Sequence, residues 1–406
     1  MRVLFAVAGG PSHLYPLVPL ARAFRRAGHQ VLLAGTPRAA RTMRSTRLST
    51  VALGGGPRLS PESRAELIDT AYGQPPWPPD WPAHPDTLDD RQARLLEVLG
   101  RYTIAAADAM ADDLVAFVGR WRPDVVIHDT LALSAAIAAT LTGVPHVRYT
   151  HGTQDVFLME YRIDGRPLPE LVELYGRFGL DPPPRAGRYV DTVPPSMFIG
   201  AERPGIVMRY VPYNGPGAAP DGLTGRTRPR VCVTWGLVVP GALGSAATDP
   251  YRETVAAIAD AGTEVVALVG PDQAASLGSP PAGVRYVTGA PLRLVLRHCD
   301  AIVHHGGEGS AMTAACLGVP QLVITREPLD DQCGGRLAAT GAAIHLRHQH
   351  VVADPAAGTA LITRSVERLL SDPAFRSAAR LLRDDVDRQP SPAAVVPVLA
   401  ALTGPG

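Results

Sequence analysis

Two histidines and a group of glycines in the second half of the chain have residue types that could bind an anion: His304-His305-Gly306-Gly307-Glu308-Gly309-Ser310. Residues 299–303 before them are apolar and β-branched, whereas residues 310–317 are alanine-rich and stop at Gly318, so the pattern predicts a strand, a glycine turn and a helix. Glycines let a ligand approach the backbone, and a helix N-terminus favours negative charge. Glycines chosen only for packing would explain the turn about as well. The two histidines at the strand end favour a phosphate site.

A second candidate is His13, which follows the first predicted strand and lies in the stretch Ser12-His13-Leu14-Tyr15-Pro16. Imidazole ordinarily titrates near pH 6.5, so a histidine at a strand end could accept a proton from a substrate at neutral pH. A lone histidine in this position is more often structural. His13 is therefore a candidate base that the residues alone leave open.

Short apolar runs alternate with helical patterns along both halves of the chain. The first half predicts strands at residues 2–7, 29–34, 123–128 and 146–150, with helices at residues 16–27, 90–121 and 133–142. The second half predicts strands at residues 231–234, 265–269, 284–288, 301–303, 321–324 and 342–346. Such β/α alternation predicts parallel sheets and an α/β fold with two Rossmann-like halves, whose strand ends position the candidate residues.

The three submotifs His304–Ser310, Gly318-Val319-Pro320-Gln321 and Asp330-Asp331-Gln332 resemble, in order and spacing, the donor-binding signature of bacterial natural-product glycosyltransferases that use nucleotide sugars. This resemblance implies the GT-B fold, in which two Rossmann-like domains face each other across a cleft. We expect an N-terminal acceptor domain at residues 1–208 and a proline- and glycine-rich linker at 209–228. A nucleotide-sugar domain at 229–380 and a C-terminal helix at 381–406, packing back on the first domain, complete the expectation.

The resemblance also assigns roles to residues of the second half. His305 would donate a hydrogen bond to the diphosphate, and Asp331 with Gln332 would hold sugar hydroxyls. His304 is either a direct contact or a packed neighbour, and Asp330 is either a solvated neighbour or a sign that the register shifts by one. The remaining expected donor contacts are Trp235, Gly236, Ala290, Gly307, Glu308, Gly309 and Ser310.

Three positions depart from the family pattern: Leu237, Gly289 and Glu308. Relatives usually carry Ser or Thr at the first, an aromatic residue at the second and a small residue at the third. A carboxylate at position 308 should repel a diphosphate, unless it contacts sugar hydroxyls or a donor amine instead. These departures leave the identity of the donor open.

For the base, the resemblance supports His13 and adds Asp129, which would orient the imidazole and stabilise its protonated form. As an alternative or additional role, Asp129 could cap the helix predicted from Leu133. The acceptor would lie near His13 and against aromatic residues of a long proline-rich loop at residues 54–92. The expected acceptor contacts are Tyr72, Trp77, Trp81, Tyr149 and His151.

Composition limits the alternatives. A chain of 406 residues exceeds one hydrophobic core, and its formal net charge of +1 gives no reason to expect nucleic acid or a membrane as partner. The sequence contains no lysine, which excludes P-loop, Schiff-base and kinase-type lysines. No apolar run reaches eighteen residues, and we expect residues 1–8 to begin a buried strand rather than a signal peptide. The four cysteines form no C-x-x-C pair, so we expect a cytoplasmic protein, with a homodimer as one option.

A metal site at His345, His348, His350 and Asp354 is disfavoured because Arg347 lies among them, and we expect neither a metal nor another cofactor. The resemblance thus implies an inverting glycosyltransferase that moves a deoxysugar from a TDP- or UDP-sugar to an apolar natural-product aglycone in antibiotic biosynthesis. Within enzymes, the alternative is a nucleotide-sugar epimerase of the same fold. From another class, the alternative is a catalytically silent nucleotide-sugar-binding or partner-activating protein.

Overall fold

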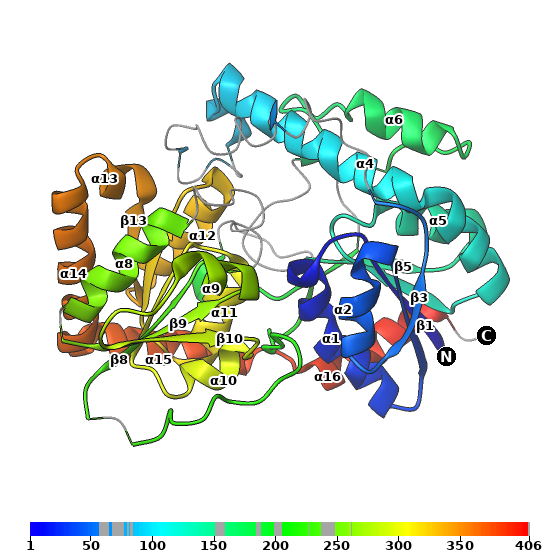
Figure 1. The fold of residues 1–406 in the computed structure, drawn as a ribbon. Coiled ribbons are helices and arrows are strands. Elements are labelled where there is room, and N and C mark those ends of the chain that lie inside the picture. The colour runs from blue at the N-terminus through cyan, green and yellow to red at the C-terminus, as the bar shows by residue number, and fades with distance from the viewer. Residues whose placement is uncertain are drawn as a thin grey trace. The chain divides into compact units, whose positions relative to one another are not determined.

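The computed structural model describes residues 1–56, 65–66, 77–78, 81, 84–150, 159–183, 188–198, 205–225, 227–236, 248–260 and 262–404. The chain forms two compact units. The colour in Figure 1 follows the chain from blue at the N-terminus to red at the C-terminus. The first unit comprises Met1–Thr192, Ile199–Arg209 and Gln389–Gly406, and the second comprises Val193–Phe198 and Tyr210–Arg388. Each unit is described separately below.

The described part of the first unit contains a seven-stranded parallel sheet with the order β3-β2-β1-β4-β5-β6-β7. Its strands are β1 (Arg2–Val7), β2 (Gln30–Gly35), β3 (Ser49–Ala52), β4 (Val125–His128), β5 (His146–Tyr149), β6 (Tyr189–Asp191) and β7 (Ile206–Val207). In this register Ala6 of β1 lies opposite His128 of β4, and His128 lies opposite Arg148 of β5. The segments that follow these three strands therefore emerge side by side at the same edge of the sheet.

The described helices of this unit are α1 (Pro11–Arg26), α2 (Ala40–Ser45), α4 (Asp90–Trp121), α5 (Leu133–Thr142), α6 (Pro169–Gly176) and α16 (Pro392–Ala400), with short 3-10 turns at Pro37–Ala39, Pro85–Thr87 and Ala401–Thr403. A capping box between Asp89 and Gln92 starts α4, and Gly143 in the left-handed conformation ends α5. In Figure 1 the red helix α16 lies beside the blue helix α1, and the two helices are in contact. The predicted start of the first helix at residue 16 was wrong, because Pro11 occupies the first helical turn, where a missing N–H costs nothing.

The described part of the second unit contains a six-stranded parallel sheet with the order β10-β9-β8-β11-β12-β13. Its strands are β8 (Arg230–Thr234), β9 (Glu264–Val269), β10 (Val284–Thr288), β11 (Ala301–His304), β12 (Gln321–Thr325) and β13 (Ala343–Arg347). Its helices are α8 (Thr248–Asp260), α9 (Pro271–Leu277), α10 (Leu292–Leu296), α11 (Glu308–Leu317), α12 (Pro328–Ala339), α13 (His348–Val352), α14 (Pro355–Ser371) and α15 (Pro373–Arg388), with a 3-10 turn at Pro195–Met197. β8 and β11 are neighbours, so the segments after Thr234 and His304 leave the sheet together.

Both faces of the second sheet are buried, as its continuous apolar strands require. Val231 and Val233 of β8 point into one core cluster together with residues of α8 and α14. Cys232 between them points into the opposite cluster, which includes residues of α10 and α11. Successive side chains of β8 thus face opposite sides of the sheet, and helices cover both sides. The parallel sheets and their covering helices confirm the predicted α/β architecture. The boundary expected at residue 380 falls inside α15, which belongs to the second unit.

Candidate active site

His13 lies in the first turn of α1, two residues after Pro11, and its side chain is 23% exposed. Its backbone N–H donates to the carbonyl of Gly10, 3.0 Å away, which fixes the first turn. The Nδ1 atom of His13 lies 3.3 Å from Oδ2 of Asp129, which immediately follows β4. The strand order thus brings together the two residues that the sequence proposed as base and orienting carboxylate.

Asp129 is fully buried and held on both oxygens. The backbone N–H groups of Ala8 and Gly9 donate to its Oδ1 and Oδ2, each over 3.3 Å. Burial raises the pKa of Asp129, but His13 and these two N–H groups outweigh burial and leave the pKa below its ordinary value. A charged carboxylate beside Nδ1 favours the proton on that nitrogen, which leaves the Nε2 lone pair able to accept another. Asp129 does not cap α5, whose N-cap residue is Ala132.

Gly9 is a residue of this site that sequence reasoning treated only as part of a turn. A Cβ atom on Gly9 would overlap the His13 ring, so the ring packs directly against the backbone of this glycine. Gly10, the next residue, has open space where its Cβ would be. The only sequence signal for this difference is that two glycines precede His13, which does not say which of them the ring needs.

The expected acceptor contacts fall into two groups. Tyr72 and His151 lie outside the described residues. Trp77 and Trp81 are buried, with ring centroids 5.0 Å apart in an edge-to-face arrangement. Tyr149 is 1% exposed, and its hydroxyl donates to the Pro16 carbonyl of α1 over 3.0 Å, so it braces the helix that carries His13.

In the second unit, His304 ends β11 and is fully buried. Its Nδ1 accepts the backbone N–H of Gly306 over 3.1 Å, so its proton is on Nε2, which donates to Oε1 of Gln321 over 2.9 Å. Burial lowers the pKa of His304 to about 4, against the raising effect of Gln321, so the ring is neutral at pH 7. Both ring nitrogens are therefore engaged within the unit, where they shape the glycine turn.

His305 lies between two glycines from different segments. A Cβ on Gly236, after β8, would lie 2.7 Å from its Cε1, and a Cβ on Gly307 would lie 2.5 Å from its Nε2. Burial and the neighbouring His304 lower the pKa of His305 to about 3, although a hydrogen bond with the Thr234 backbone raises it. The imidazole is therefore a neutral hydrogen-bonding group, and both glycines are needed to make room for it.

The turn then enters α11, whose N-cap is Gly307 and whose first residue is Glu308. Glu308 is mostly buried, and Sγ of Cys333 on α12 donates to its Oε2 over 3.7 Å. Gly309 is exposed and Ser310 is partly exposed at the same helix end. The first turn of α11 thus offers backbone N–H groups to an anion, while the Glu308 carboxylate contacts α12.

The two neighbouring carboxylates of α12 have opposite surroundings. Oδ1 of Asp331 accepts the Thr325 hydroxyl over 2.7 Å and lies 3.0 Å from Nε2 of His345, while Oδ2 accepts Nε of Arg347 over 2.9 Å. Burial raises the pKa of Asp331, but these partners outweigh burial and lower it. Asp331 is thus already held by three side chains, and only about one of its four lone-pair sites stays open to a ligand.

Asp330 is buried and packs against the glycine turn, since a Cβ on Gly306 would lie 2.9 Å from the Cβ of Asp330. Burial raises the pKa of Asp330 well above its ordinary value, and the nearby acidic residues Glu327, Glu308 and Asp331 raise it further. This shift stabilises the protonated form of Asp330 relative to an ordinary carboxyl, and a protonated carboxyl can donate as well as accept. Gln332, beside them, is also buried.

The other expected donor contacts are at strand ends. Trp235, after β8, is buried and its side chain is part of the sheet core. Ala290, at the start of the segment leading into α10, packs against the opposite core cluster. Gly289 before it has φ +69°, a backbone conformation that a side chain would strain. Leu237 lies outside the described residues.

No group of three or more potential metal-binding side chains occurs among the residues that the structure describes. His345 instead contacts Asp331, and a Cβ on Gly334 would overlap its ring. Among the described helices, none is long and apolar enough to cross a membrane. Both observations concern only the described parts of the chain.

Comparison with known proteins adds three findings. Residues 22–236 and 252–402 match the N- and C-terminal domain families described as erythromycin biosynthesis protein CIII-like. The chain is 34% identical to aklavinone 7-beta-L-rhodosaminyltransferase of Streptomyces galilaeus, over 99% of this chain and 96% of the relative. It is 32% identical to 3-alpha-mycarosylerythronolide B desosaminyl transferase of Saccharopolyspora erythraea, over 99% and 98% of the two chains.

Among solved structures, spinosyn rhamnosyltransferase SpnG in complex with thymidine diphosphate matches with a TM-score of 0.80 and 29% identity, over 98% of this chain and 100% of that one. The two parallel sheets of this chain therefore have the expected GT-B fold.

Proposed function

Since this chain belongs to the erythromycin biosynthesis protein CIII-like family of glycosyltransferases, we propose that it uses His13 as general base and Asp129 as the carboxylate that orients it. Its reaction is the transfer of a deoxysugar from a TDP-sugar to a natural-product aglycone in antibiotic biosynthesis. Relatives are named both for aminodeoxysugars, as in rhodosaminyl- and desosaminyltransferases, and for other deoxysugars, as in a 2-deoxy-L-fucose transferase, so they support a deoxysugar donor without selecting one. The relative solved with thymidine diphosphate supports TDP as the leaving group rather than UDP.

The observation that carries this proposal is the 3.3 Å contact between Nδ1 of His13 and Oδ2 of Asp129. With its proton on Nδ1, the imidazole accepts the acceptor hydroxyl proton at Nε2 while the hydroxyl oxygen attacks the anomeric carbon. The bond from that carbon to the diphosphate oxygen breaks on the opposite face, so the configuration inverts. The buried, charged Asp129 then stabilises the imidazolium that forms.

The departing diphosphate needs groups that compensate its negative charge, and we assign this role to His305 and the first turn of α11. His305 has a lowered pKa of about 3 and is therefore neutral, with a single N–H that the Thr234 carbonyl accepts. For His305 to donate to the diphosphate, this N–H must exchange the Thr234 carbonyl for a phosphate oxygen. The N–H of Gly309 and the hydroxyl of Ser310 lie at the positive end of the helix dipole, while the N–H of Ser310 donates to the Gly307 carbonyl over 3.0 Å. His304 is excluded from this role because both its nitrogens are engaged within the unit.

For the sugar, we assign Asp330 with Gln332 rather than the expected Asp331, which corresponds to the one-residue shift that the sequence left open. Asp330 packs against Gly306, whereas Asp331 is held by Thr325, His345 and Arg347. Asp330→Ala should therefore reduce turnover unequally across TDP-sugars that differ in their hydroxyl or amino groups, since unpaired buried polar groups discriminate strongly. Asp331→Ala should reduce turnover equally for all of them, by loosening α12.

The decisive experiment measures turnover and TDP affinity of His13→Ala with a panel of TDP-deoxysugars and hydroxyl acceptors. General-base catalysis contributes about 10²–10⁴ in rate, so kcat should fall by that factor while TDP binds as in the wild type. Asp129→Asn should lose more activity on aliphatic alcohols than on phenols, because a phenol gives up its proton more readily. Near-normal turnover of aliphatic alcohols by His13→Ala would exclude this base. Epimerised TDP-sugar without transfer, or binding without turnover, would instead support one of the two alternative functions.

A further inference from the structure

A buried ion pair joins β5 to the segment at residues 159–161. Arg148 donates through Nη1 and Nη2 to the two carboxylate oxygens of Glu160, and their side chains are only 9% and 7% exposed. Arg148 lies opposite His128 in the pairing of β5 with β4. Its side chain therefore extends from a position next to the end of β4, which Asp129 follows. Sequence reasoning singled out Tyr149 and passed over this neighbour, because an arginine in an apolar strand has no local pattern that reveals its partner.

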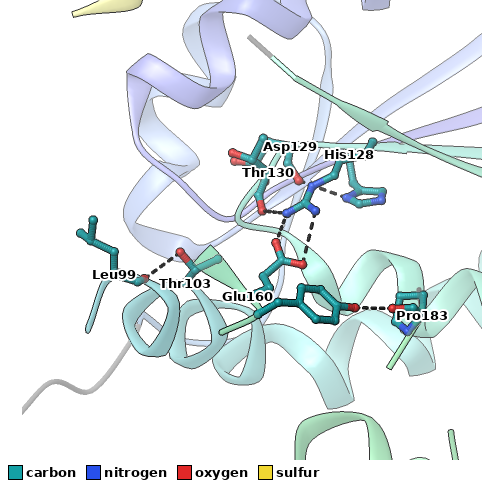
Figure 2. A network of polar contacts seen from close by, with 9 residues as sticks. Leu99, Thr103, His128, Asp129, Thr130, Glu160 and Pro183 are labelled. Carbon is teal, nitrogen blue, oxygen red and sulfur yellow. Dashed lines mark hydrogen bonds and ion pairs between the residues drawn. The ribbon is translucent and has the colours of Figure 1, made fainter. Parts of the chain in front are cut away.

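The same guanidinium reaches the segment that carries Asp129. Nη2 of Arg148 also donates to the carbonyl of Thr130 over 2.8 Å. Nδ1 of His128 donates to the carbonyl of Asp129 over 3.0 Å, and the Asp129 N–H donates to Ala6 over 3.0 Å. Figure 2 shows Glu160 facing the segment of His128, Asp129 and Thr130. Hydrogen bonds therefore fix the backbone before and after Asp129, and Arg148 makes the one that holds Thr130, the residue that follows Asp129.

Glu160 is itself fixed by contacts that do not involve Arg148. Its carbonyl accepts the N–H of Leu168 over 3.0 Å, and the hydroxyl of Tyr161 donates to the Pro183 carbonyl. The carbonyl of Met159 packs so closely on α4 that a Cβ at Gly100 would overlap it. The backbone of Glu160 is thus held in place independently of Arg148, and Arg148 connects the Glu160 carboxylate to the Thr130 carbonyl.

Stability alone does not account for such a pair. Desolvating two charges is costly, and apolar side chains of similar size often stabilise a fold as well as a buried ion pair does. What apolar side chains cannot supply is the hydrogen bond to Thr130. We propose that Arg148 is a positioning residue, anchored by Glu160, that holds the Asp129–Thr130 backbone and so keeps the Asp129 carboxylate at His13. This inference rests on the proposed base.

The first test replaces the whole pair in the full-length enzyme, as Arg148→Met with Glu160→Leu. The double variant should keep a melting temperature close to that of the wild type and an unchanged KM for the TDP-sugar. Its kcat should fall roughly ten- to a hundred-fold, the scale expected when a catalytic group moves by about 1 Å. The loss should be larger for aliphatic than for phenolic acceptors. A folded double variant with wild-type kcat, or with equal losses on both acceptors, would overturn the proposal.

The second test uses Arg148→Lys, which keeps the charge facing Glu160 but lacks the planar fork needed to bond Glu160 and Thr130 together. This single substitution tests the positioning role of Arg148 even if the double variant does not fold. In the wild-type background kcat should fall several-fold. In the Asp129→Asn background the same substitution should cost nothing more, because residues that act through one another are not additive. Equal losses in both backgrounds would show that Arg148 acts independently of Asp129, against the proposal.

Arg177→Gln is the matched control, since it breaks the exposed contact of Arg177 with Asp108, 2.8 Å long, within the same unit. Its kcat should equal that of the wild type. His13→Ala, measured alongside, separates the two hypotheses. If His13→Ala stays active, the proposed base is wrong. If His13→Ala is inactive but Arg148→Lys is fully active, only the positioning role is wrong.

Discussion

The imidazole of His13 packs on the backbone of Gly9 so closely that a methyl group on Gly9 would overlap the ring. Gly9 also donates its N–H to Oδ2 of Asp129 over 3.3 Å. One glycine thus makes room for the proposed base and helps to hold its carboxylate, which gives a first prediction.

Gly9→Ala should displace the His13 ring and lower kcat by about tenfold or more, with little change in TDP affinity, because small misplacements of a base are costly. Gly10→Ala is the control, since its Cβ would meet nothing within 4 Å. That variant should lose only the modest stability expected for alanine at an N-cap. Steady-state kinetics and TDP titration of both variants check this, and equal kcat values would contradict it.

The diphosphate seat gives a second prediction. Gly307→Ala should push the His305 ring away, because its Cβ would lie 2.5 Å from Nε2. TDP affinity should then fall nearly as far as in His305→Ala, by roughly ten- to a hundred-fold, the scale of a hydrogen bond to a charged group. Gly335→Ala, on the exposed face of α12 where a Cβ meets nothing, should bind TDP normally. Calorimetric titration of the three variants measures this, and unchanged affinity of Gly307→Ala would speak against His305.

The third prediction concerns stability against pH. The raised pKa of Asp330 means that the folded protein holds a proton that the unfolded chain releases, so stability falls as the pH rises above about 4. Asp330→Asn should remove part of this fall and leave the protein at least as stable at pH 8. Thermal unfolding between pH 5 and pH 8 tests the direction.

Asp331 supplies the opposite case in the same experiment. Its lowered pKa contributes stability that is complete above about pH 4 and is lost as the pH falls through the folded-state pKa. Asp331→Asn should therefore destabilise the protein at pH 7 by about 1–3 kcal/mol, the cost of disturbing hydrogen bonds to a buried charge. Equal destabilisation by both substitutions at pH 8 would contradict the different surroundings assigned to the two carboxylates.

A fourth prediction follows from assigning the diphosphate charge to protein groups. If His305 and the first turn of α11 compensate it, sugar transfer should proceed unchanged with EDTA present. Adding Mg²⁺ should give no increase. Turnover that EDTA abolishes and Mg²⁺ restores would show that these groups do not carry the diphosphate alone.

The sequence by itself determined the long elements of the fold, but not the short strands β3, β6 and β7 or the start of α1. Buried strands, the glycine ends of α5 and α11 and the start of α4 at Asp90 are set by near neighbours along the chain, so apolar periodicity and capping residues were sufficient. His13 and His305 could be named in advance because each lies where a predicted strand ends, and the family resemblance added Asp129.

Only the tertiary structure decided how these residues meet. His13 and Asp129 lie together because β4 pairs with β1 in a register that puts His128 opposite Ala6, and strand order is not written in any local pattern. The enclosure of His305 by two glycines depends in the same way on the pairing of β8 with β11.

The sequence also could not distinguish the roles of Asp330 and Asp331. Nor could it reveal that Arg148 connects Glu160 to Thr130. Two carboxylates have the same intrinsic pKa and differ in pKa only through the burial and the partners that folding gives them. Those partners come from segments far apart in the chain, so desolvation and pairing could not be assigned until the sheet and its neighbours were assembled.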